Sequence, residues 1–294
     1  MAKLTIVVNC TERKSQAPSP ELCVRSLPDG TSKRRFATWR RRVEEAAPSA
    51  VLNDLYQGEA WQQTRGLATD ATDLEFSVKL LVASAGLGLR EALSKGPAYA
   101  ATFAVGHPDT VAPSGIASPT WWKSLADLDA ANSLVETTDD RVLLVLSDSY
   151  ARAMDDDLTA LADRGGDLLL VGGARDVDGM PRLPADASLR RALGGTASSV
   201  SLRMARRWLA KRSTTDLYCP KDGAKWNRWA QSVSHTENFD RTPVSDAQVR
   251  RLIRAMKSRD PSLSATRALR QVRDSGIACE QKRFGQLFRT TATR

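Results

Sequence analysis

The chain is poor in the residues that build metal sites and nucleophile sites. It has two histidines, His107 and His235, and four cysteines that stand apart without a CxxC pair. Zinc sites need three or four such ligands at short spacings, so we expect no metal site. Neither histidine accompanies a serine in a nucleophile motif, which argues against a serine–histidine–acid hydrolase. Isolated cysteines are typical of a reducing compartment, and we expect a cytoplasmic protein.

Long apolar runs and nucleotide-binding loops are also missing. No apolar run approaches the roughly 18 residues of a membrane span. The first residues, MAKLTIVVNC, lack the small-residue cleavage site of a signal peptide. No GxGxxG follows the first apolar run, and no Walker A lysine loop is present. The sequence therefore predicts no membrane partner and no cofactor.

Excess charge is confined to one end of the chain. Residues 241–294 contain 13 Lys and Arg against 4 Asp and Glu, and this excess equals the net charge of the whole chain, +9. A neutral body with a cationic tail favours a polyanion partner, most often nucleic acid. The alternative is a solvated helical face that only aids solubility.

Short apolar runs that alternate with helical patterns predict an α/β fold for residues 1–212. Four runs predict buried strands of a mostly parallel sheet with flanking helices: residues 4–8, 80–83, 141–146 and 167–171. Residues 213–240 turn polar and aromatic without clear periodicity and predict a linker with some packed pieces at Trp226 and Trp229. Residues 241–294 predict a small all-α domain.

This C-terminal domain has three helical patterns. Ser245 or Asp246 is expected to cap the first helix, Gly276 to end the second, and Phe284 to face inward from the third. Two short helices joined by a glycine turn, the last one basic, are typical of a helix-turn-helix. The outward side chains expected to contact a nucleic-acid backbone are Lys282, Arg283, Gln286 and Arg289. A protein-docking unit is the alternative.

Polar residues follow the predicted strands at the ends where α/β proteins bind ligands. The first strand is followed by Asn9 to Lys14, the second by Ser84, Gly86 and Gly88, and the third by Asp148. Bare backbone at the two glycines would let a ligand approach. Glu12 and Asp148 are the strand-end carboxylates, although Asp148 could equally cap the following helix.

Other residues add stacking and hydrogen-bonding groups. Tyr56 and Tyr99 could stack on a base, although aromatic residues near helix starts are more often core. Asn9, Ser84 and Thr102 could bond a base edge, and Arg13 and Lys14 add charge. Such groups suit cleavage of an N-glycosidic bond, in which a carboxylate stabilises an oxocarbenium-like transition state. Catalysis would involve Glu12, Asp148 and Asn9.

A basic amphipathic helix is predicted over residues 34–47. Arg40 and Arg41 could contact phosphates. Equally, this could be a surface helix with Trp39 docked inward.

Several motifs, in order, resemble a bacterial family with a uracil-DNA-glycosylase-like fold, related to the glycosylase-like domain of archaeosine-type tRNA enzymes. They are VVNCTERK at 7–14, LYQG at 55–58, SAGLGL at 84–89 and PAY at 97–99 with Thr102, and 193–209 is a weaker match. Asn9 stands where the family often has Ser, and Glu91 where Asp-Pro is usual.

The resemblance implies an enzyme that acts on a base in DNA or RNA. Some bacterial defence proteins of this kind remove modified cytosines from phage DNA, so we expect a DNA glycosylase in antiviral defence, with double-stranded DNA as the favoured partner. Two other hypotheses stay open. The chain could bind nucleic acid without catalysis, or it could exchange bases as a transglycosylase does.

Overall fold

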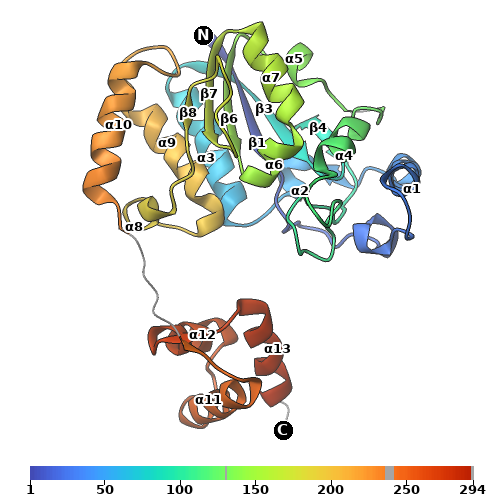
Figure 1. Cartoon of the computed structure of the whole chain (residues 1–294), viewed down its shortest axis with the longest axis vertical. Helices are drawn as coiled ribbons and strands as arrows, with labels where there is room; N and C mark the ends of the chain where they lie inside the picture. Colours follow the sequence, from blue (N-terminus) through green and yellow to red (C-terminus); the bar gives the residue numbers. More distant parts are fainter. Residues whose placement is uncertain (130, 236–241, 293–294) are drawn as a thin grey trace. The chain divides into compact units, whose positions relative to one another are not determined.

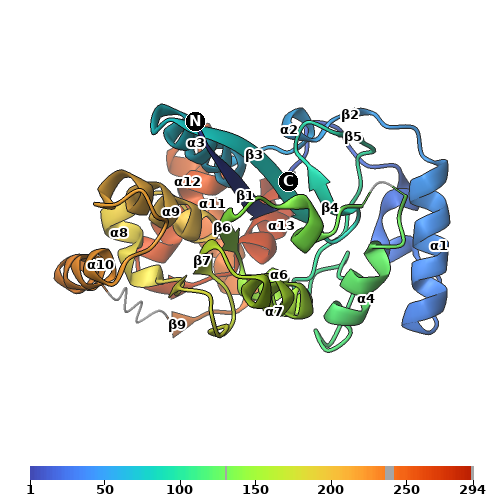
Figure 2. The ribbon, with the colours of Figure 1, turned by 90° about the horizontal axis from the view of Figure 1, so that it is seen from above.

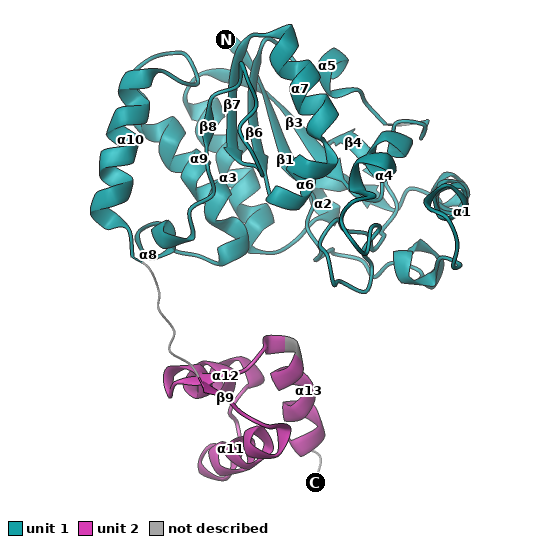
Figure 3. Ribbon diagram, in the orientation of Figure 1, with its two compact units in different colours: residues 1–235 teal, residues 236–294 magenta. Residues whose placement is uncertain are grey.

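The fold is described from a computed structural model that covers residues 1–129, 131–235 and 242–292. The chain divides into two compact units, Met1–His235 and Thr236–Arg294, here called unit 1 and unit 2 (Figure 3). Each has its own apolar core. No helix in the described ranges combines the length and apolarity needed to cross a bilayer.

Unit 1 is built on a mostly parallel sheet of six strands in the order β4-β3-β1-β6-β7-β8 (Figure 1). The strands are β1 (Ala2–Asn9), β3 (Phe76–Ser84), β4 (Gly88–Glu91), β6 (Arg141–Leu146), β7 (Asp167–Gly172) and β8 (Arg182–Leu183). All neighbours pair in parallel except β3 and β4. Continuous apolar runs such as Leu143–Leu146 are buried, as expected of strands covered on both faces.

The sheet has two more strands than the four predicted. Strand β4 has only four residues and begins at Gly88, so its sequence predicts a glycine turn and not a strand. Strand β8 has only two residues and pairs with β7 at Leu170 and Val171. Both are edge strands, too short to show a periodic pattern.

Helices cover both faces of the sheet (Figure 2). One face carries α3 (Glu59–Asp73) and α9 (Val200–Lys211), and the other carries α6 (Asp148–Ala153) and α7 (Asp155–Arg164). Beyond the β4 edge lie α1 (Ser32–Glu45) and α4 (Ser118–Leu125). The shorter elements are α2 (Leu52–Leu55), α5 (Leu134–Thr137), α8 (Arg190–Leu193), and strands β2 (Ala50–Val51) and β5 (Lys95–Gly96), which pair with each other.

The predicted linker is wrong over half of its 28 residues. Helix α10 (Pro220–Val233) fills that stretch and packs on α9. Trp226 is buried and its ring centroid lies 5.8 Å from that of Trp208. The apolar face of α10 has only a few residues, and charged residues lie between them. The helical spacing of its apolar residues is therefore hard to recognise in the sequence. Residues 236–240 of the predicted linker lie outside the described residues.

Unit 2 has three helices around a small core. They are α11 (Asp246–Arg259), α12 (Ala265–Asp274) and α13 (Gln281–Ala292), with β9 (Thr242–Pro243) paired to β10 (Ile277–Ala278). Ser245 caps α11 in a capping box with Gln248, as its sequence suggests. The core contains Ile253, Leu269 and Phe284.

Candidate functional site

A pocket of about 440 Å³ opens beside the carboxyl end of β1. We call it the Glu12 pocket, and its polar lining includes Cys10, Glu12, Lys14, Tyr99, Thr102, His107, Asp109 and Tyr150. The first three residues follow β1, the middle four belong to the irregular segment after β5, and Tyr150 lies on α6. The volume falls within the roughly 300–1,000 Å³ range of small-molecule sites.

Tyrosine hydroxyls form the inner wall of the pocket. The Tyr99 hydroxyl lies 2.5 Å from Ser84 Oγ and 2.8 Å from the Tyr56 hydroxyl. The Tyr150 hydroxyl lies 3.1 Å from Cys10 Sγ. Burial raises the pKa of all three tyrosines, so they stay neutral and act as hydrogen-bonding groups.

The glycine turn after β3 supports the pocket from behind. A Cβ at Gly86 would lie 2.4 Å from the Tyr99 ring, so only glycine lets that ring pack against the turn. Trp39 Nε1 donates to the Gly86 carbonyl at 2.8 Å, and Trp121 Nε1 donates to the Ala85 carbonyl at 2.9 Å. Ser84 Oγ accepts from the backbone of the turn. The turn is therefore held by aromatic side chains.

Five residues predicted to contact a base lie outside the pocket lining, and one of them, Arg13, lines the second hollow described below. Ser84 and Tyr56 are fully buried. Gly86 is covered by Tyr99, and Gly88 turns the chain with φ of +73° beneath α4. Of the predicted base contacts, the structure brings Lys14, Tyr99 and Thr102 to the pocket.

Lys14 lies inside the pocket against the tyrosine wall. Its Nζ donates to the Thr11 carbonyl at 3.2 Å and lies 4.2 Å from the centre of the Tyr99 ring. Burial lowers the pKa of Lys14, although the nearby Cys10, Glu12 and Asp109 oppose that shift. The ammonium form is thus disfavoured relative to a solvated lysine.

Glu12 and His107 form a pair at the pocket mouth. His107 Nδ1 accepts from the Asp109 backbone N–H at 3.0 Å, which assigns the proton of the neutral ring to Nε2. Nε2 lies 3.1 Å from Glu12 Oε1. The Glu12 side chain is 83% exposed, so it reaches both solvent and the pocket.

Asp109 anchors the loop that carries His107. Its carboxylate pairs with the Arg25 side chain at 2.9 Å and accepts from the Arg25 backbone N–H at 3.1 Å. His107 and Asp109 are not among the site residues that the sequence predicts. Both residues lie in the long irregular segment between β5 and α4. Long segments of this kind are often functional, and this was the feature of the sequence that could have indicated them.

Asn9 and Asp148 do not join Glu12 in this pocket. Asn9 Oδ1 accepts from the Ser147 backbone N–H at 2.9 Å and ties the end of β1 to the end of β6. Asp148 is the first residue of α6, its side chain is exposed, and it lines none of the pockets described here. The two carboxylates predicted to share one site are therefore not brought together by any pocket.

A second hollow of about 650 Å³ lies on the other side of residues 9–13. We call it the Glu59 cleft, and its lining includes Asn9, Arg13, Glu59, Thr196 and Ser198. Arg13, a predicted base contact, lies here and packs beside Gly58; it is absent from the lining of the Glu12 pocket. Glu12 lines both hollows.

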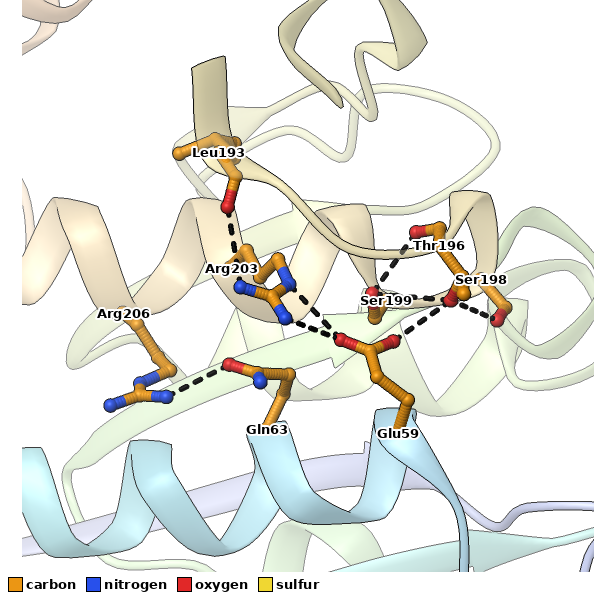
Figure 4. Close-up of polar contacts among 8 residues, drawn as sticks. All are labelled: Glu59, Gln63, Leu193, Thr196, Ser198, Ser199, Arg203 and Arg206. Carbon is orange, nitrogen blue, oxygen red and sulfur yellow. Dashed lines mark hydrogen bonds and ion pairs between the residues drawn. The ribbon is translucent and has the colours of Figure 1, made fainter. Parts of the chain in front are cut away.

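A partly buried network of hydrogen bonds around the Glu59 carboxylate forms one wall of this cleft (Figure 4). Glu59 Oε1 accepts from Arg203 at 2.7 Å, and Oε2 accepts from the Thr196 hydroxyl at 2.8 Å. Burial opposes ionisation of Glu59, but hydrogen bonds from Ser199, Arg203 and Thr196 outweigh it and lower its pKa. The network joins α3 to α9.

The predicted phosphate contacts differ in their surroundings. On α1, Trp39 faces inward and is fully buried, Arg40 pairs with Glu44 at 2.8 Å, and Arg41 is exposed. On α13, Gln286 and Arg289 are exposed, and the Lys282 side chain lies outside the described residues.

Arg283 is not an outward phosphate contact. It pairs with Asp246 at 2.6 Å and donates to the Val244 carbonyl at 2.7 Å, which fixes α13 to the start of α11. Its helical position alone suggested a solvent-facing side chain.

Among the described residues, no group of three or more His, Cys, Asp and Glu side chains is placed to hold a metal ion. Comparison of the chain with protein-family models, curated proteins and solved structures finds no match.

Proposed function

We propose that the chain is a DNA glycosylase that receives one modified base in the Glu12 pocket and hydrolyses its N-glycosidic bond. The observation that carries this proposal is the meeting of an exposed carboxylate, a histidine and tyrosine side chains in one pocket of about 440 Å³. The pocket lies at the strand ends where α/β sheets bind ligands. A base would have to leave the duplex stack to enter it.

The Glu12–His107 pair supports hydrolysis in particular. Departure of the base leaves positive charge on the sugar, which the Glu12 carboxylate is suited to stabilise or to attack through an oriented water. His107 Nε2 lies 3.1 Å from Glu12 Oε1, and a hydrogen bond between them would orient that carboxylate toward the sugar. A pocket that only binds a base has no need of an exposed carboxylate at its mouth.

Unit 2 is proposed to hold the duplex. Helices α12 and α13, joined across Gly276, would act as a helix-turn-helix with α13 in the major groove. Its base-reading and backbone contacts would come from exposed side chains such as Gln286 and Arg289. The positive charge of this unit would supply phosphate affinity that does not depend on sequence.

The resemblance of the strand-end motifs suggests phage DNA with modified cytosines as the target, met in the bacterial cytoplasm. Under this proposal the chain protects a host against phages whose DNA carries such bases, and it leaves abasic sites in that DNA. Phages with unmodified DNA should escape it.

The direct test incubates the full chain with duplexes that carry different modified bases. We expect a free base by mass spectrometry and an alkali-labile site in the DNA for at least one duplex. Glu12→Gln should lower the rate by about 10²-fold or more, since it removes the ionised carboxylate. Glu136→Gln, a matched change at an exposed glutamate of α5, should leave the rate unchanged.

Two results would reject hydrolysis. Binding to duplexes without base release from any of them would leave a nucleic-acid-binding protein without catalysis. Incorporation of a labelled free base without an abasic product would instead identify base exchange.

A further inference from the structure

Lys14 is the one residue of the Glu12 pocket lining that combines an amine with burial against aromatic rings. We propose that Lys14 is a nucleophile that forms a Schiff base with C1′ of the deoxyribose, which adds strand cleavage to base removal. This inference rests on the proposed function, because it assumes that a nucleotide enters the Glu12 pocket.

The backbone around Lys14 is fixed on both sides. Lys14 forms an antiparallel bridge with Tyr56, Ser15 N donates to the Leu55 carbonyl at 2.8 Å, and Gln57 N donates to the Arg13 carbonyl at 2.9 Å. A nucleophile gains rate when its position is set before the substrate arrives. This pairing makes the orientation of Lys14 a property of the fold.

The surroundings of Nζ suit a neutral amine. Nζ has two carbonyl partners, Thr11 at 3.2 Å and Glu12 at 3.5 Å, so an uncharged amine would place both of its hydrogens on them and keep its lone pair for an electrophile. Burial also lowers the pKa of Lys14, so more of it is unprotonated near neutral pH. Lysine nucleophiles are commonly activated by such desolvation.

The reaction balances with groups of the pocket and water. The Nζ lone pair bonds to C1′, the C1′–N bond breaks, and its electron pair leaves with the base, which takes up a proton. Nζ loses a proton, the C1′–O4′ bond opens with protonation of O4′, and the nitrogen lone pair forms the C=N bond. Loss of a proton from C2′ then expels the 3′ phosphate. Water hydrolyses the imine and restores the lysine.

Glu12 and His107 would serve the proton transfers. The Glu12 carboxylate lies at the mouth of the same pocket and can accept the C2′ proton, and His107 Nε2–H can protonate a leaving group. Hydrolysis by water alone needs only the carboxylate. The half-buried amine of Lys14 is the feature that adds lyase chemistry.

Borohydride trapping tests this proposal without knowledge of the base. A duplex with one preformed abasic site presents the aldehyde directly, and reduction of the imine joins protein to DNA permanently. We expect a trapped complex with the full chain whose DNA-bearing peptide contains Lys14. Trapping should become faster as pH rises and should level off below pH 10.5, the ordinary pKa of lysine.

Matched variants separate Lys14 from other amines. Lys14→Arg keeps a long basic side chain beside Tyr99 but lacks a nucleophilic amine, and it should lower trapping by about a hundredfold. Lys221→Arg, the same change on the exposed side of α10, should trap like wild type. Peptide mapping of wild-type protein gives the answer even if Lys14→Arg fails to fold.

The outcomes distinguish this proposal from the proposed function. Trapping through another amine, or none with wild-type protein, would overturn the role of Lys14. Base release with intact strands and no trapped complex would also overturn it while glycosylase activity stands. Trapping on abasic DNA without release of any base would support Lys14 and reject the glycosylase proposal.

Discussion

Glu12 and Lys14 lie two residues apart, yet they meet opposite surroundings. The Glu12 side chain is 83% exposed at the pocket mouth, whereas Lys14 lies inside against the Tyr99 ring. In the sequence, both are polar residues that follow the first strand, and nothing distinguishes their surroundings. What separates them is the pairing of residues 13–15 with residues 55–57, a contact between distant segments that local pattern does not reveal.

Gly86 should be intolerant of any side chain, because its place is taken by Tyr99. A Cβ there would lie 2.4 Å from one ring carbon, and the ring is held by hydrogen bonds to Ser84 and Tyr56. Gly86→Ala should therefore lower the free energy of unfolding by roughly 2 kcal/mol, as overpacking of a core does. Thermal or urea unfolding of the full chain measures this.

Gly285→Ala provides the control for this prediction. The same methyl group on α13 meets only the Arg289 side chain, at 3.8 Å, and should stabilise the helix slightly. Equal stability of Gly86→Ala and wild type would mean that the turn behind Tyr99 is not tightly packed.

At the scale of elements, the contact between α3 and α9 depends on charged side chains. Arg203 pairs with Glu59 at 2.7 Å, and Arg206 donates to Gln63 (Figure 4). Arg206 also pairs with Asp70 at 2.6 Å. A Cβ at Gly66 would lie 2.6 Å from the Arg206 guanidinium, so that glycine makes room for it. These pairs fix the wall of the Glu59 cleft.

Glu59→Gln should destabilise unit 1 in a pH-dependent way. The folded state lowers the pKa of Glu59, so the carboxylate adds stability above its unfolded pKa of about 4.5 and loses it as pH falls through the folded value. We expect a loss of roughly 2 kcal/mol at pH 7, since removal of one partner leaves Arg203 partly buried without its charge. Urea unfolding at pH 7 and at pH 3 measures the free energy of unfolding above and below the unfolded pKa of Glu59.

The stabilities of wild type and Glu59→Gln at pH 3 show whether the ionised carboxylate causes the loss. The gap between wild type and Glu59→Gln should shrink at pH 3, while Glu136→Gln should match wild type at both pH values. A gap of constant size would trace the loss to packing of the amide and not to the ionised carboxylate.

The sequence predicted the elements that have a clear apolar pattern and missed those that lack one. Strands β1, β3, β6 and β7 have apolar runs that only a doubly covered sheet accommodates. Strands β4 and β8 are too short for a pattern, and the apolar positions of α10 are diluted by lysine and arginine. Of the site, the loop after β1 was found, whereas His107 and Asp109 depend on how a long irregular segment folds back.

At the scale of the whole molecule, charge and pocket belong to different units. The Glu12 pocket lies in unit 1, and the excess positive charge lies in residues 241–294. Separate cores allow the two units to fold independently, so they can divide the work between chemistry and phosphate binding. This division predicts that mutations in unit 2 change affinity for DNA more than the rate of the bound complex.

The salt dependence of DNA binding tests this division, with substitutions at Arg250, Arg251 and Arg254. All three are exposed on α11. If each neutralises one phosphate, their joint replacement by alanine should reduce the slope of log affinity against log salt by roughly 3, since each contact contributes about 0.9. Fluorescence anisotropy with a labelled duplex at several salt concentrations measures the slope. Release of a base at saturating DNA should keep its rate, because the Glu12 pocket is untouched.

An unchanged slope would instead assign phosphate binding to other cations, among them Arg40 and Arg41 on α1. The same salt titration of their alanine variants would then show the reduced slope.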